Sequence, residues 1–197
     1  MATSANRQFE RTAPQGLYRG GVVILVRMND HILVVPDDRY QWFKPFAGIA
    51  CYDEGEDLRL SGMRELIEEA FVYDLKKTTR YVPNDVSSSV PISRSSSLGF
   101  EVGSLTPHGH VTQKGVAVND ANKAYEAVVE WDISGIEVPF SIALEEEWWA
   151  KHWSGVSVYA MNRHTGAIEG VYSGQQGYLE LPKLGIHPTL KAELGTS

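Results

Sequence analysis

The most informative part of this chain is residues 48–72, which read GIACYDEGEDLRLSGMRELIEEAFV. Its tail, Arg64–Glu69, reads as the second half of a helix whose acidic start is Glu56-Asp57. On the helical period, Glu65, Glu68 and Glu69 fall on one face, within an arc of roughly 100°. Like charges at this spacing repel one another by about 0.2–0.5 kcal/mol a pair, so the face is either solvated or neutralised by a cation. Carboxylate ligands on a short rigid element suit Mg2+ or Mn2+.

The spacing of these residues resembles the signature of the Nudix hydrolases. That signature is Gly, five residues, Glu, seven residues, Arg-Glu, an aliphatic, any residue, Glu-Glu, any residue, Gly and an aliphatic. Here Glu56 takes the place of the first glutamate, and seven residues separate it from Arg64. The remaining matched positions follow in register: Glu65, Leu66, Glu68, Glu69 and Val72.

Two positions depart from the signature. Gly48 lies eight positions before Glu56 where the pattern has six, so either the loop carries two extra residues or Ala50 occupies the glycine place. Phe71 replaces the terminal glycine. A glycine there can end a helix with positive φ, which Phe adopts only at a cost, so we expect this helix to end differently or later.

The resemblance implies a metal-dependent enzyme that cleaves a diphosphate joined to another group. A diphosphate needs cations to neutralise its charge and to orient the attacking water. Mg2+ or Mn2+ is the implied cofactor. The implied metal site consists of three glutamates, a supporting glutamate, a backbone carbonyl and an ion-pairing arginine: Glu65, Glu68, Glu69, Glu56, Gly48 and Arg64.

The general base is not fixed by the motif. Asp120 and Glu126 are the first candidates, because they flank the start of a later predicted strand, and Glu145–Glu147 are the second. A base must come within hydrogen-bond distance of a metal-bound water.

The turn at Pro45–Gly48 is similar to one in the ADP-ribose and nucleotide-sugar branch of the family, whose members are commonly dimers. This similarity favours ADP-ribose or a nucleotide sugar as substrate and makes a homodimer an expectation. An aromatic run before the turn either stacks on a base or fills the core. The substrate-binding candidates in this run are Tyr40, Trp42, Phe43 and Lys44.

The composition argues against a nucleic-acid-binding protein and against a membrane-spanning protein. The net charge is −7 and the densest basic group is Lys76, Lys77 and Arg80, which argues against nucleic-acid binding. The longest apolar run, Val22–Val26, is far shorter than the ~20 residues that span a membrane. The start of the chain lacks the apolar core of a signal peptide, and the single Cys51 fits a reducing compartment, so we expect a cytoplasmic protein.

The order of elements predicts an α+β fold: a Nudix-type α/β/α sandwich with a mixed central sheet and a β-rich C-terminal extension. We expect a loose arm over residues 1–16, a Nudix domain over 17–155, and an extension over 156–197 packed on that domain. The run from Gly20 to Asp37 predicts a hairpin that turns at Asn29-Asp30.

Further strands are predicted at 81–82, 100–105 and 125–133, followed by short strands within 156–181 that turn at Asn162–Gly166. Residues 107–122 read as a loop, and the serine-rich segment 85–98 as a mobile or edge segment. Ser141–Trp153 has the period of a helix with a wide apolar face.

Two other functions stand beside hydrolysis. One is a nucleotide sensor that has the fold but does not cleave its ligand. Phe71 and the lengthened loop, which depart from the signature, are compatible with this alternative. The other is a structural or interaction protein whose acidic helix is merely solvated.

Overall fold

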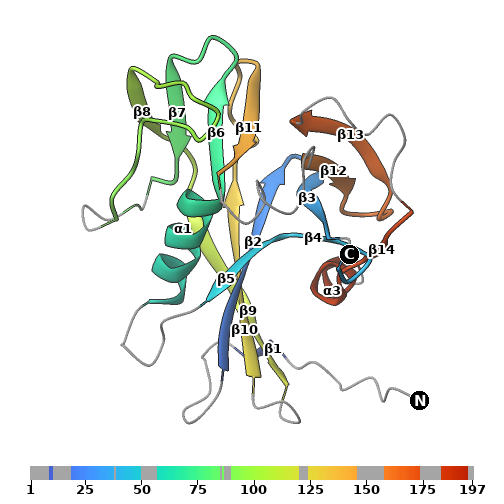
Figure 1. The fold of residues 1–197 in the computed structure, drawn as a ribbon. Helices are drawn as coiled ribbons and strands as arrows, with labels where there is room; N and C mark the ends of the chain where they lie inside the picture. Colours follow the sequence, from blue (N-terminus) through green and yellow to red (C-terminus); the bar gives the residue numbers. More distant parts are fainter. Residues whose placement is uncertain are drawn as a thin grey trace.

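The computed structural model describes residues 9–10, 19–37, 39–49, 57–84, 86, 90–119, 124–145, 158–173 and 183–194. Within these residues the chain forms strands and two helices that Figure 1 shows in sequence colours. In chain order they are β1 (Phe9–Glu10), β2 (Arg19–Met28), β3 (His31–Asp37), β4 (Trp42–Lys44), β5 (Phe46–Ile49), α1 (Leu58–Glu69), β6 (Ala70–Asp74), β7 (Thr79–Val82), β8 (Ser104–Pro107), β9 (Val111–Asn119), β10 (Ala124–Asp132), β11 (Phe140–Leu144), β12 (Val158–Asn162), β13 (Ile168–Ser173), β14 (Gly185–Ile186) and α3 (Pro188–Leu194).

The described strands form two sheets. The larger has the order β1-β9-β10-β2-β3-β12-β13, with β5 paired to β2 and β4 placed between β3 and β14. It is mixed, because β10 runs parallel to β2 while β2 and β3 are antiparallel. The smaller sheet has the order β11-β6-β7-β8, with β7 and β8 parallel. The predicted α+β class with a mixed central sheet is confirmed.

The predicted hairpin is also confirmed. β2 and β3 pair antiparallel, and their turn at Asn29-Asp30 has Asn29 at φ 54°, a left-handed conformation that asparagine tolerates better than most residues. Both faces of β2 are buried, so its β-branched run forms one central strand. The strands predicted at 81–82 and 125–133 correspond to β7 and β10, and those within 156–181 include β12 and β13.

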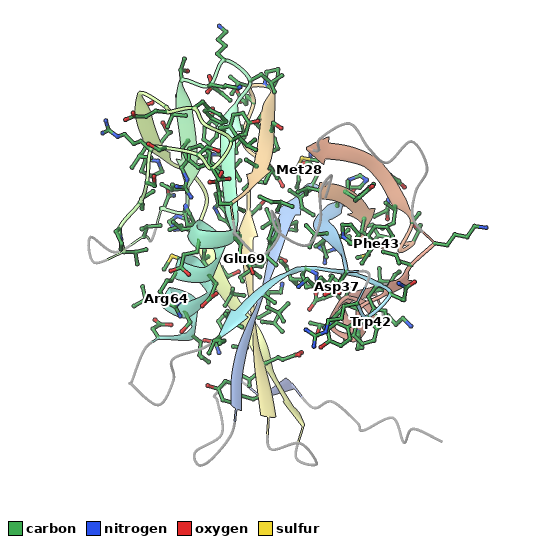
Figure 2. The ribbon with its side chains drawn as sticks, in the orientation of Figure 1. Met28, Asp37, Trp42, Phe43, Arg64 and Glu69 are labelled. Atoms are coloured by element: carbon green, nitrogen blue, oxygen red, sulfur yellow. The ribbon has the colours of Figure 1, made fainter. Side chains whose placement is uncertain are left out.

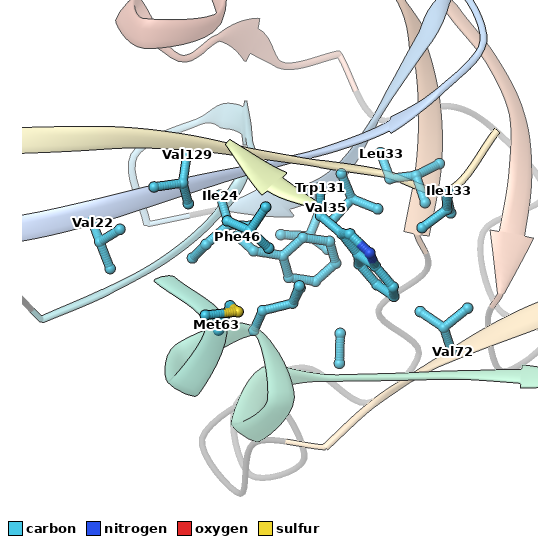
Figure 3. Close-up of a cluster of buried hydrophobic side chains, with 14 of the residues drawn as sticks. Val22, Ile24, Leu33, Val35, Phe46, Met63, Val72, Val129, Trp131 and Ile133 are labelled. Carbon is cyan, nitrogen blue, oxygen red and sulfur yellow. The ribbon is translucent and has the colours of Figure 1, made fainter. Parts of the chain in front are cut away.

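Helix α1 covers one face of the larger sheet. Figure 3 shows Met63 of α1 directed at the cluster formed by Val22, Ile24 and Phe46. The helix approaches this closely because Gly62 has no side chain: a Cβ there would lie 2.5 Å from Cγ2 of Val129. The contact brings the glutamates of α1 next to the strands that support the candidate site.

Replacing Gly62 by Ala is therefore expected to destabilise the protein. The overlap with Val129 should cost about 1–3 kcal/mol, which exceeds the gain of about 1 kcal/mol from better helix propensity. Urea unfolding measures the difference, and Arg59→Ala, at an exposed position of the same helix, should stay within about 0.5 kcal/mol of the wild type. A Gly62→Ala variant as stable as the wild type would contradict the close packing.

The opposite face of the larger sheet carries the C-terminal helix α3. Leu190 is fully buried there against a second apolar cluster that includes Val23, Leu25, Val128 and Tyr159. The layers are therefore helix, sheet and helix, as predicted, although α3 itself was not foreseen. No helix in the described part of the chain is long and apolar enough to cross a membrane.

Two predictions for the middle of the chain were wrong, and one predicted strand is displaced. The helix predicted over Ser141–Trp153 begins as strand β11, which pairs antiparallel with β6, while residues 146–153 lie outside the described residues. Sheet pairing overrides the helical period of the apolar residues here. The loop predicted over 107–122 contains β9, which pairs with both β1 and β10. The strand predicted at 100–105 is displaced to β8.

The turn between β6 and β7 is closed by one carboxylate. Asp74 accepts hydrogen bonds from the Thr78 amide (2.7 Å), the Thr79 amide (2.8 Å) and the Thr78 hydroxyl (2.7 Å). Burial alone raises the pKa of Asp74, but these hydrogen bonds outweigh burial and lower the pKa below its ordinary value. The ionised carboxylate therefore stabilises the turn.

Replacing Asp74 by Ala is expected to cost roughly 1–3 kcal/mol of stability at pH 7, because the Thr78 and Thr79 amides lose their acceptor. The folded-state pKa lies below the unfolded value of about 3.9, so this contribution is present above that pH and disappears as the pH falls through the folded-state pKa. Urea unfolding at pH 7 and at low pH should show the wild-type advantage shrinking. An advantage of equal size at both pH values would contradict a role for the ionised Asp74 carboxylate. Glu137→Ala, at an exposed site, serves as the control.

Candidate active site

Helix α1 begins with a capping residue and ends directly at a strand. Asp57 is the N-cap, and its side chain accepts a hydrogen bond from the Arg59 amide at 2.8 Å. The helix ends at Glu69, and Ala70 is already extended, with φ −134° and ψ 137°. Phe71 therefore lies in β6, fully buried, and not at a left-handed helix end. The helix thus ends differently from the signature, as expected, but not later.

Glu65 lies against the backbone of β5. A Cβ at Gly48 would stand 1.9 Å from Oε2 of Glu65 and 2.1 Å from its Cδ, so the carboxylate occupies the space that any larger residue would fill. Gly48 pairs with Val22 of β2, on the side of the sheet that α1 covers. The missing side chain at Gly48 thus leaves the space that the Glu65 carboxylate occupies.

Glu69 lies one helical turn further on and is bound to the neighbouring residue of β5. Its Oε2 accepts a hydrogen bond from the Ala47 amide at 3.2 Å, and the residue is only 5% exposed. Figure 2 shows Glu69 at the end of α1 above Arg64. Glu65 and Glu69 therefore both face the two consecutive residues Ala47 and Gly48.

Arg64 joins the helix to the same strand. Its Nη1 donates to Oε1 of Glu65 at 2.7 Å, and its Nη2 donates to the carbonyl of Ile49 at 3.1 Å. Oε2 of Glu68 lies 3.9 Å from Arg64 Nη1, and the Glu68 side chain is 61% exposed. Arg64 is thus an ion-pairing residue that holds Glu65, while Glu68 reaches into solvent.

The surroundings of Glu65 disfavour the ionised form of its carboxylate. Burial raises the pKa of Glu65 above its ordinary value, the Arg64 guanidinium opposes this effect, and the nearby Glu68 adds to it. A divalent cation would offset both burial and the repulsion between carboxylates. The donor set of carboxylate and backbone oxygens suits a hard cation such as Mg2+ or Mn2+.

The described residues contain no group of three or more His, Cys, Asp or Glu side chains that converge on one point. Glu65 and Glu69 share the β5 side of α1, while Glu68 points away. Several positions singled out from the sequence lie outside the described residues: Ala50, Cys51, Glu56, Asp120, Glu146 and Glu147.

The carboxylates of the described base candidates bind other groups. Glu126 lies on the α3 side of the sheet, where its Oε2 accepts a hydrogen bond from the Thr189 hydroxyl at 3.0 Å. Glu145 lies near the end of α1, and its amide donates to the Glu69 carbonyl at 2.9 Å. Its carboxylate accepts hydrogen bonds from the Ser96 hydroxyl (2.6 Å) and the Ser97 amide (2.5 Å). The serine-rich segment thus holds Glu145 in place.

The aromatic run divides between surface and core. Tyr40 is exposed and stacks on Trp42, which in turn contacts His187 edge to face at 5.2 Å between ring centroids. Phe43 is buried against Tyr159. Nζ of Lys44 lies 3.4 Å from the buried carboxylate of Asp37. Figure 2 shows Trp42 and Asp37 far from Arg64, beside the C-terminal segment.

Two contributions to the site were not foreseen in the sequence. The Ala47 amide binds Glu69, although the only backbone group expected at the site was the Gly48 carbonyl. Arg80, which the sequence groups with Lys76 and Lys77 as its densest basic residues, is buried and binds the end of α1. Neither carries a local sequence signal, because each depends on a contact between distant segments.

No family model matches the sequence, and none of the curated proteins matches it. The solved structures that are similar in part include the following two. The crystal structure of an ADP compounds hydrolase is 16% identical, with a TM-score of 0.33, over 69% of this chain and 60% of that chain. A bifunctional NMN adenylyltransferase/ADP ribose pyrophosphatase from Francisella tularensis, complexed with AMP and Mn ion, is 17% identical, with a TM-score of 0.35, over 68% of this chain and 33% of that chain. In both cases the similar part spans less than two thirds of the other protein.

Proposed function

We propose that this chain is a metal-dependent hydrolase that cleaves the diphosphate linkage of a nucleoside diphosphate joined to another group. The observation that carries the proposal is the placement of Glu65 and Glu69 against Ala47 and Gly48. Two carboxylates one helical turn apart are held at β5: Gly48 leaves room for Glu65, and the Ala47 amide binds Glu69. This arrangement is consistent with the resemblance of residues 48–72 to the Nudix signature.

In this proposal the acidic face of α1 holds Mg2+ or Mn2+ through Glu65 and Glu69, with Glu68 turning inward from solvent. Glu56 and the Gly48 carbonyl are the proposed supporting ligands. When bound, the cation supplies the positive charge that a diphosphate needs for attack by water. Arg64 keeps Glu65 in place through its ion pair and its hydrogen bond to Ile49.

For the substrate we favour ADP-ribose or a nucleotide sugar. The stacked rings of Tyr40 and Trp42 offer a partly exposed aromatic surface of the kind on which a base can stack. This surface lies beside the C-terminal segment and not beside α1. We therefore propose that the aromatic surface of one copy of the chain and the acidic face of α1 of a second copy bind the same substrate molecule. Asp120 is the proposed general base. The proposed assembly is a homodimer, and the proposed location is the cytoplasm.

Phosphate release from a panel of compounds tests the proposal. The panel contains ADP-ribose, NADH, sugar nucleotides, dinucleoside polyphosphates and nucleoside triphosphates, each with Mg2+ or Mn2+ and a coupled phosphatase where needed. We expect turnover of at least one diphosphate compound and its loss on addition of a chelator. Turnover that is indifferent to the chelator would rule out the metal-dependent mechanism.

A nucleotide sensor is the second candidate. The observation that favours it is that protein groups already bind both carboxylates: the Ala47 amide binds Glu69, and Arg64 binds Glu65. A sensor should show a higher melting temperature with one compound of the panel but no turnover of any. A hydrolase should show both effects.

A further inference from the structure

Arg80 is a buried cation at the end of α1. It lies in β7, is 2% exposed, and has its guanidinium carbon 4.3 Å above the ring of Phe71. Its Nη2 donates to the carbonyls of Ile67 (2.8 Å) and Ala70 (3.2 Å), and its Nη1 donates to the carbonyl of Ser93 (2.7 Å). One side chain thus joins α1, β6 and the segment that follows β7.

These contacts take the place of a glycine helix end. The last carbonyls of a helix lack intrahelical partners, and a left-handed residue after the helix commonly satisfies them. Here the chain passes directly from α1 into β6, and Arg80 binds the carbonyls of Ile67 and Ala70, on either side of Glu69. The carbonyl of Glu69 itself accepts the amide of Glu145. The backbone that carries Glu69 is therefore fixed from both sides.

The charge of Arg80 also matters. A cation at a helix C-terminus interacts favourably with the helix dipole. Burial lowers the pKa of Arg80 to about 10, although the nearby Glu145 raises it, so the guanidinium stays charged at neutral pH. Its Nε, buried as well, has no hydrogen-bond partner among the described residues. A lysine keeps the charge but lacks the planar fork that reaches several carbonyls at once.

We propose that Arg80 is a positioning residue that ends α1 and holds the Glu69 carboxylate against the Ala47 amide. Phe71, at the place of the signature glycine, supplies the ring on which the guanidinium rests. The effect on Glu69 stands on the geometry alone, whereas the effect on turnover rests on the proposed function.

The test compares Arg80→Lys and Arg80→Met with the wild type and with Arg94→Lys, an exposed arginine of the segment that follows β7. Hydrogen exchange of the Ala47 amide, followed by NMR, reports its bond to Glu69. Steady-state kinetics with the best compound of the panel, at saturating Mg2+ and well below the melting temperature, report the site.

For both Arg80 variants we expect faster exchange at Ala47, by at least about tenfold, since local opening sets this rate. We expect kcat to fall by about 10–100-fold with little change in KM, as is usual for residues that orient metal ligands. Arg94→Lys should match the wild type in both measurements. A folded Arg80→Lys variant with wild-type exchange at Ala47 would overturn the proposal.

Two further outcomes remain decisive. If the wild type hydrolyses nothing in the panel, the proposed function fails, and the exchange at Ala47 alone decides the role of Arg80. If neither Arg80 variant folds, the wild type is used: NMR couplings across the hydrogen bonds from the Arg80 guanidinium to Ile67 and Ala70 support the role, and their absence overturns it.

Discussion

Replacing Glu69 by Gln is expected to reduce diphosphate hydrolysis at least about 100-fold, because a metal ligand contributes several kcal/mol of charge stabilisation in the transition state. The fold should survive, since a glutamine oxygen can still accept the hydrogen bond from the Ala47 amide. Steady-state kinetics at saturating Mg2+ measure the loss, and urea unfolding checks that stability is retained.

Glu101→Gln provides the matched control, because Glu101 is an exposed glutamate outside α1. It should leave kcat and KM unchanged. Wild-type turnover by a folded Glu69→Gln variant would remove Glu69 from the site and leave only a solvated acidic helix.

Replacing Gly48 by Ala is expected to reduce turnover by a similar factor with little change in stability. The new methyl group would overlap the Glu65 carboxylate, whose Oε2 lies 1.9 Å from the Cβ position. Because Glu65 is long and rotatable, it can swing away at little cost in stability, and its ion pair with Arg64 is then lost. A catalytic group displaced by about 1 Å can cost roughly 100-fold in rate.

Gly21→Ala is the control for Gly48→Ala, because it introduces the same methyl group on the neighbouring strand. A Cβ at Gly21 meets nothing closer than 3.7 Å, which is an ordinary contact. Its kinetics should equal those of the wild type. If Gly48→Ala also turned over at the wild-type rate, the position of Glu65 against β5 would not matter to the reaction.

Much of the framework could be predicted because it is encoded locally. The turn residues Asn29-Asp30 between two β-branched runs specify the hairpin of β2 and β3. The spacing of Glu65, Glu68 and Glu69 places them on a helix that does form. The sequence could not predict which of these glutamates is exposed. In the structure Glu68 is exposed, whereas Glu65 and Glu69 lie against β5.

The parts that could not be predicted depend on contacts between distant segments. β11 forms because its backbone pairs with β6, although the period of its side chains fits a helix. Arg80 looks like a surface charge beside Lys76 and Lys77, and only the end of α1, more than ten residues earlier in the chain, explains its burial. The left-handed glycine expected after a helix is unnecessary where a side chain binds the last carbonyls.

In the function proposed above, Glu65 and Glu69 hold a divalent cation against β5. Titration of the protein with Mn2+, followed by the electron paramagnetic resonance signal of the free ion, tests it without any substrate. We expect saturable binding that Mg2+ competes away and that Glu65→Gln and Glu69→Gln each weaken at least about tenfold. Mn2+ affinity equal in the wild type and both variants would contradict it.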